Sequence, residues 1–94
     1  MTIEKASDLL NKAGIWAEIS WRNKVQFNGD YEDIYELTEQ PKSGAIWFYR
    51  ANGSQAYYAF DQMNQKISVI TEPADLGIQY LIAMRTLVQE VAER

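Results

Sequence analysis

The chain has 94 residues, of which 47% are hydrophobic and 13% aromatic, and its formal net charge is −4. This length predicts a single domain spanning residues 1–94 that buries roughly 60–65% of the surface of its unfolded chain. Histidine and cysteine are absent, which excludes the usual catalytic triads and metal sites built on imidazole or thiolate, so we expect a non-catalytic protein without metal or cofactor.

The first predicted element is a helix near the amino terminus. Thr2 can cap its start through the side-chain oxygen, and Gly14 suits its end because glycine readily adopts a left-handed backbone. The apolar residues recur every three or four positions, which is typical of a helix with one buried face: Ile3, Ala6, Leu10 and Ala13.

From Ile15 the apolar period changes to two, which predicts a strand or a tight hairpin broken near residues 22–24 and ending at Asn28-Gly29. Trp16 is the one apolar exception on the even-numbered face. The odd positions are otherwise the apolar ones: Ile15, Ala17, Ile19, Trp21, Val25 and Phe27.

Residues 30–39 carry five carboxylates, and no lysine or arginine occurs between Val25 and Pro41. Nucleic acids attract a basic surface, so this charge distribution argues against direct nucleic-acid binding. Tyr31, Ile34, Tyr35 and Thr38 share a helical face with Asp30 as a cap, and we predict a short helix over residues 31–38. A strand through Ile34–Leu37 is the alternative, since tyrosine and isoleucine also favour strands.

Residues 45–60 are predicted to form a β-hairpin that is aromatic on both faces. Asn52-Gly53 is the strongest short signal for a two-residue type I′ turn, which would pair Trp47 with Tyr58 and Phe48 with Tyr57. One face would then carry Trp47, Tyr49, Tyr58 and Phe60, and the other Ile46, Phe48 and Tyr57.

A sheet with one face in water alternates apolar and polar residues, and this hairpin does not. Both faces therefore need cover. The first helix and residues 31–38 could close a three-layer monomer. Alternatively a partner protein, a second copy of the chain or an apolar ligand could cover the second face.

The carboxyl-terminal third predicts a turn at residues 61–65, a strand at Lys66–Ile70 and a helix at Pro73–Ala92, because proline is tolerated in a first helical turn. The resulting order, α-β-β-(α)-β-β-β-α, predicts an α+β fold with an antiparallel sheet of four or five strands and terminal helices packed on it. The apolar stripe of the last helix is Tyr80, Leu81, Met84, Leu87, Val88 and Val91, widened by Ile78 and Ile82.

These features favour a protein-binding module, such as an inhibitor, an immunity-like protein, an adaptor or a chaperone-like protein. Its partner would be another protein, a basic one in particular, or a second copy of this chain. Aromatic residues and arginine are enriched where interfaces derive most of their binding energy. The candidate contact residues are Tyr31, Glu32, Asp33, Tyr35 and Glu36 in the acidic segment, and Phe48, Arg50 and Tyr57 on the sheet.

The alternative function is a small-molecule sensor with an apolar pocket between the sheet and the last helix. That pocket would be lined by Trp47, Tyr58, Tyr80 and Met84. The amino terminus is charged, and no apolar run approaches the length that spans a membrane. We therefore expect a cytoplasmic protein that does not bind membranes, and the absence of cysteine is compatible with that compartment.

Overall fold

The computed structural model describes residues 1–21, 24–27, 30–33, 43–53 and 55–94. Over these ranges the chain forms the helices α1 (Ile3–Lys12) and α3 (Ile78–Ala92). The strands are β1 (Trp16–Trp21), β2 (Lys24–Phe27), β3 (Asp30–Asp33), β4 (Ser43–Tyr49), β5 (Gln55–Asp61) and β6 (Lys66–Thr71).

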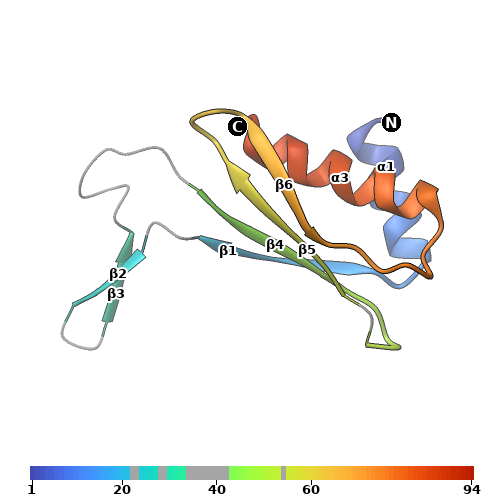
Figure 1. Cartoon of the computed structure of the whole chain (residues 1–94), viewed down its shortest axis with the longest axis horizontal. Helices are drawn as coiled ribbons and strands as arrows, with labels where there is room; N and C mark the ends of the chain where they lie inside the picture. The colour runs from blue at the N-terminus through green and yellow to red at the C-terminus, as the bar shows by residue number, and fades with distance from the viewer. Residues whose placement is uncertain (22–23, 28–29, 34–42, 54) are drawn as a thin grey trace.

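Four strands form an antiparallel sheet in the order β1-β4-β5-β6, and β2 pairs with β3 in a separate two-stranded sheet. Helices α1 and α3 pack against each other and lie together on one face of the four-stranded sheet (Figure 1). This confirms the predicted α+β architecture with terminal helices on an antiparallel sheet.

Helix α1 begins and ends as its sequence predicts. The Thr2 hydroxyl accepts a hydrogen bond from the Lys5 backbone N–H at 3.2 Å. At the other end Gly14 has a φ of +72°, and the Ile15 N–H donates to the Leu10 carbonyl at 2.9 Å. Leu10 and Ile15 are both buried, which gives this glycine-terminated helix end its usual apolar contact.

Helix α3 begins at Ile78, with Gly77 as its N-cap, so the predicted start at Pro73 is wrong. Thr71 instead ends β6. In the segment after it, Glu72 accepts hydrogen bonds from Tyr58 of β5 and Arg85 of α3. Met84 and Val88 of α3 are buried, whereas Ile78 and Ile82 are 65% and 44% exposed and do not widen the core.

The region after β1 departs from the prediction. Strands β1 and β2 belong to different sheets and do not pair with each other. Asp30–Asp33 is a strand, paired with β2 so that Tyr31 lies opposite Gln26. The helix predicted for residues 31–38 is therefore wrong where it can be compared, and its remainder, with the alternative strand at 34–37, lies outside the described residues.

The β4–β5 hairpin forms as predicted, but its register differs by one residue. Trp47 lies opposite Tyr57 and Phe48 opposite Ala56. The turn is closed by the Gly53 N–H, which donates to the Arg50 carbonyl at 3.0 Å. Gly53 has a φ of +85°, but Asn52 does not have a positive φ, so the type I′ turn is absent.

The observed register divides the side chains differently between the two faces. The face under the helices has a buried centre, which forms the core with both helices. It consists of Ile46 and Phe48 from β4 and Ala56, Tyr58 and Phe60 from β5.

Candidate functional site

The sheet face opposite the helices carries a group of aromatic side chains from β1, β4 and β5. Cross-strand register places Trp16 beside Tyr49, and in the next row Glu18 beside Trp47 and Trp47 beside Tyr57. Further along the strands the residues become small, with Ser20 beside Ala45 and Ala45 beside Ala59. We call Trp16, Trp47, Tyr49 and Tyr57 the aromatic face.

The rings of the aromatic face stack against one another in two pairs. The centroids of Trp47 and Tyr57 are 3.9 Å apart with an interplanar angle of 15°. Those of Trp16 and Tyr49 are 6.0 Å apart at 23°. Trp16 is 51% exposed, and the other three side chains are half-buried. One side of each ring therefore lies against its neighbour, and the two rings of each pair hold each other in position.

A shallow recess of about 330 Å³ lies further along the sheet, where Ser43, Ala59 and Ser68 contribute small side chains to its lining. Asp61 and Lys66 lie at its edge, directly opposite each other on β5 and β6. A hydrogen bond from Asn64 lowers the pKa of the Asp61 carboxyl, so this carboxylate is ionised at neutral pH. The recess is therefore lined largely by small side chains and carries charged groups at its edge.

The structure separates the predicted contact residues. Tyr57 belongs to the aromatic face. Phe48 is 2% exposed and packs edge-on against Tyr58 at 5.8 Å between centroids. Its assignment as a surface residue followed from the wrong hairpin register and has to be corrected, because a ring in the core cannot contact a partner.

Arg50 is held within the chain. Its Nη2 donates to both carboxylate oxygens of Asp75, at 2.8 and 2.9 Å. The Arg50 side chain is only 15% exposed, against 64% for Asp75. The ion pair therefore joins the end of β4 to the segment before α3, and Arg50 has a structural contact in place of the open surface position that was predicted.

The acidic contact residues are described only in part. Tyr31, Glu32 and Asp33 lie in β3, opposite Gln26, Val25 and Lys24. Tyr35 and Glu36 lie outside the described residues.

The predicted ligand pocket does not form from its four residues. Trp47 and Tyr58 lie on opposite faces of the sheet. Tyr58 and Met84 are 0% and 1% exposed, so their side chains are packed in the core. Because the pocket needed Trp47 and Tyr58 on the same side, its prediction shares the error in register.

A polar triad that the sequence analysis does not predict crosses the boundary of the core. The Tyr58 hydroxyl donates to Glu72. Arg85 donates to the same carboxylate through Nε at 2.8 Å and Nη2 at 2.5 Å. The partners are 14 and 13 residues apart along the chain, so no local pattern links them. The only sequence signal is that Arg85 is the single charged residue between positions 78 and 89.

The triad is charged and paired at neutral pH. The Arg85 hydrogen bonds lower the pKa of Glu72. Burial, with the Glu72 carboxylate beside it, raises the pKa of Tyr58 far above its ordinary value. Glu72 is therefore a carboxylate with three hydrogen bonds and Tyr58 a neutral donor, an arrangement that joins β5, the end of β6 and α3.

Comparisons with protein-family models, with curated proteins and with solved structures found no match to this chain. Among the described residues, no three acidic side chains are close enough to hold a metal ion. In the same part of the chain, neither helix is long and apolar enough to cross a membrane.

Proposed function

We propose that this chain is a non-catalytic protein-binding module and that the aromatic face is its docking surface. The observation that supports the proposal is the pair of ring stacks, Trp16 on Tyr49 and Trp47 on Tyr57, on the side of the sheet away from both helices. Tryptophan and tyrosine are the residues that most often dominate the binding energy of protein interfaces.

The stacking favours a protein over a sugar or a nucleobase as the ligand. A sugar or base binds by lying flat on an open ring, and each ring here already has a neighbour on one side. Tryptophan and tyrosine combine an apolar ring with a polar group, which suits the mixed apolar and polar contact of a protein interface. The recess further along the sheet has room for a side chain of the partner.

Charge favours a basic partner. Glu18 is exposed and lies beside Trp47, and the whole chain carries a net charge of −4. Opposite charge on the partner would speed association and make the affinity depend on salt. If the affinity for the partner were unchanged between low and high salt, the partner would not be recognised by its charge, and the aromatic face alone would remain as the proposed docking surface.

The proposed classes, an inhibitor, immunity-like protein, adaptor or chaperone-like protein of the cytoplasm, differ in the partner and share this surface. Site-specific photo-crosslinking in the native cell tests the surface directly. A benzophenone side chain is placed at Trp16, which is 51% exposed, or at the control position Met63, which is 72% exposed in the turn between β5 and β6.

We expect a discrete cross-linked product from position 16 and none from position 63. A product of twice the mass of the chain would identify a second copy as the partner. No product from position 16, or the same product from both positions, would contradict the proposal, because the control is the more exposed of the two.

A further inference from the structure

Strand β6 forms one edge of the four-stranded sheet and is almost entirely exposed. It is the last strand in the order β1-β4-β5-β6, and five of its six residues are exposed. Val69 and Ile70 are 47% and 53% exposed. No strand in the described part of the chain pairs with its outer edge, where backbone N–H and C=O groups can accept another strand.

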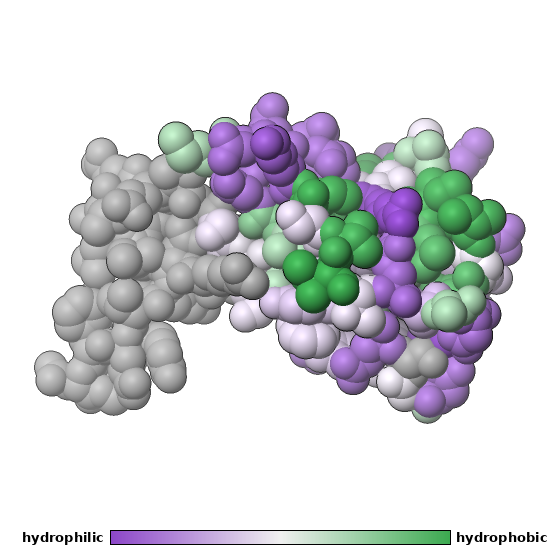
Figure 2. All heavy atoms as spheres, in the orientation of Figure 1, coloured by the Kyte–Doolittle hydropathy of each residue, from purple (hydrophilic) through white to green (hydrophobic). Residues whose placement is uncertain are grey.

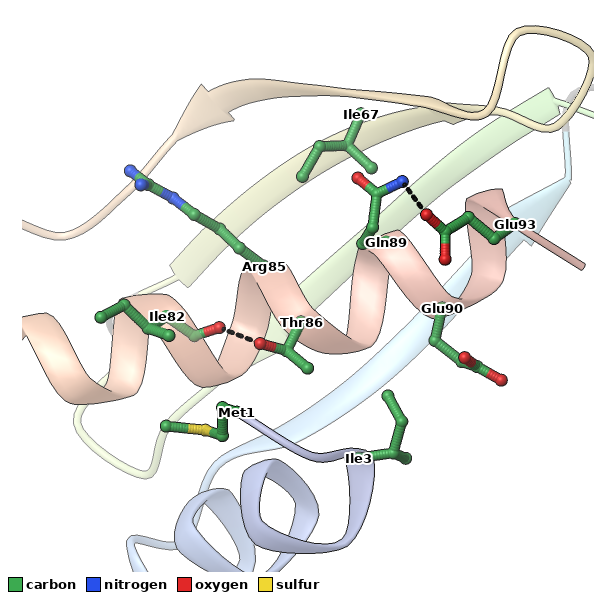
Figure 3. A pocket seen from close by; sticks show the side chains of 9 residues that line it. All are labelled: Met1, Ile3, Ile67, Ile82, Arg85, Thr86, Gln89, Glu90 and Glu93. Carbon is green, nitrogen blue, oxygen red and sulfur yellow. Dashed lines mark hydrogen bonds between the residues drawn. The ribbon is translucent and has the colours of Figure 1, made fainter.

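A groove of about 460 Å³ lies next to this edge, over the outer surface of α3. Ile67 of β6 borders it on one side of the helix and Met1 and Ile3 on the other, with Ile82 at one end (Figure 3). Figure 2 shows apolar side chains over β6 and over the first turns of α3, with a polar band between them. The edge and the groove thus offer separate aliphatic contacts on one side of the molecule.

The groove is acidic at its other end. Glu90 and Glu93 line it and are exposed. Arg85 also lines it, but its guanidinium is paired with Glu72 at 2.5 Å, which compensates its charge. The surface that an incoming chain would meet therefore carries Ile67, Val69 and Ile70 along β6 and is negative near the end of α3. Lys66, at the start of β6, lies opposite Asp61.

We propose that the outer edge of β6 binds an extended, basic peptide segment of a partner protein by strand addition. The backbone of the peptide continues the sheet, alternate aliphatic side chains lie against Val69 and in the groove, and lysine or arginine lies near Glu90 and Glu93. In strand addition the backbone supplies affinity and alternate side chains supply specificity. This site is distinct from the aromatic face and goes beyond the function proposed for it.

Charge separates this partner from a second copy of the chain. Two copies would each carry a net charge of −4 and would repel, whereas a basic segment is attracted. Mutual pairing of two β6 edges is accordingly an outcome that would replace the proposal.

Three synthetic peptides of about eight residues, long enough for an ordinary strand, test the site. The first alternates valine and lysine, the second alternates valine and glutamate, and the third is the first with alternate backbone nitrogens methylated. Binding is measured by fluorescence anisotropy to the wild type, to Val69→Lys, and to the matched control Met63→Lys. Val69 is 47% exposed on β6 and Met63 is 72% exposed in a turn.

We expect the lysine peptide to bind about tenfold or more tightly than the glutamate peptide, because opposite charge favours it. Methylation removes the backbone donors that strand addition needs, so it should weaken binding by at least about tenfold. Val69→Lys should weaken binding as much, because it adds a like charge at the edge. Met63→Lys should leave binding close to that of the wild type.

Absent binding of the lysine peptide would overturn the proposal, as would equal binding of the methylated peptide or equal losses in Val69→Lys and Met63→Lys. A wild-type dimer in light scattering that Val69→Lys converts to a monomer would assign the edge to a second copy instead. Neither result bears on cross-linking from Trp16, so the two surfaces fail independently.

Discussion

At the scale of single residues, Glu72 has the most consequential contacts. It receives hydrogen bonds from Tyr58 on β5 and Arg85 on α3, and its side chain is only 14% exposed. A carboxylate so placed is stable only while its donors are present, since an unpaired buried charge is costly. The triad therefore couples the position of α3 to the sheet.

We expect Tyr58→Phe to lower the free energy of unfolding by about 1 kcal/mol, since it removes one hydrogen bond. Glu72→Ala should cost about 2–3 kcal/mol, because it leaves the buried Tyr58 hydroxyl without its acceptor. The double variant should lose less than the two single losses combined, because both lack the same bond. Urea denaturation of the three variants measures this coupling.

Glu90→Ala is the matched control for that series, since Glu90 lies on the same helix as Arg85 but is exposed. Its loss should stay within about 0.5 kcal/mol, as for most surface changes. Strictly additive losses for Tyr58→Phe and Glu72→Ala would contradict the role assigned to the triad.

Stability should depend on pH through the same residues. The pKa of Tyr58 is raised in the folded state, so the unfolded chain loses this proton first, near pH 10. The stabilisation is complete below that pH and is lost as the pH rises further. Tyr58→Phe should abolish this alkaline loss in urea midpoints measured from pH 7 upward, and the same decline in both proteins would contradict the assignment.

At acidic pH the dependence of stability on pH has the opposite direction. The pKa of Glu72 is lowered on folding, so its contribution is complete above its unfolded pKa of about 4.3 and is lost as the pH falls through the lower folded value. Glu72→Gln should therefore flatten the acid limb of the same urea series, whereas Glu90→Gln should leave it unchanged.

Among the elements, the pairing of β1 with β4 includes a close approach at Gly44. A Cβ added there would overlap the Ser20 carbonyl oxygen and lie 3.0 Å from the Phe60 ring. One of the overlapping atoms belongs to the backbone, so it cannot move aside as a side chain could. The pairing of β1 with β4 therefore depends on a glycine at this position.

We expect Gly44→Ala to lower the free energy of unfolding by more than about 2 kcal/mol, because over-packing forces the strands apart. Gly53→Ala is the comparison. No atom lies within 4 Å of its added Cβ, so it should cost only the backbone strain of a positive φ, about 1–2 kcal/mol. Urea denaturation compares the two, and a smaller loss for Gly44→Ala would contradict the close approach.

An element could be predicted from the sequence where the residues that determine it lie within that element. Thr2 and Gly14 act within a turn of α1, and the period of two from Ile15 acts within β1, so both elements could be predicted. Helix α3 was placed five residues too early because Pro73 is compatible with a helix start. The segment before α3 is instead held by residues distant in the sequence, because Glu72 pairs with Arg85 and Asp75 pairs with Arg50.

The register of the β4–β5 hairpin is a second feature that the local sequence does not determine. In the pair Asn52-Gly53 the glycine can readily take a positive φ, but the sequence does not specify whether Asn52 also has a positive φ. With Gly53 alone in that conformation, the pairing shifts by one and every cross-strand partner changes. The predicted contact residues Phe48 and Tyr57 shared one face in the predicted register, and in the structure they occupy opposite faces.

In the molecule as a whole, the two faces of the four-stranded sheet differ in what covers them. Both helices and the core side chains cover one face (Figure 1). In the described part of the chain, the opposite face carries stacked rings that are partly accessible. The β6 edge lies between these two faces, so the two binding surfaces that we propose are separate.

Phe48 belongs to the core and Tyr57 to the aromatic face, and the unfolding free energies of Phe48→Ser and Tyr57→Ser test this division. We expect Phe48→Ser to lose about 3–5 kcal/mol, as for a fully buried phenylalanine, and Tyr57→Ser to lose less than half as much while remaining folded. Equal large losses would mean that both rings are enclosed in the core, and the aromatic face could then not be a docking surface.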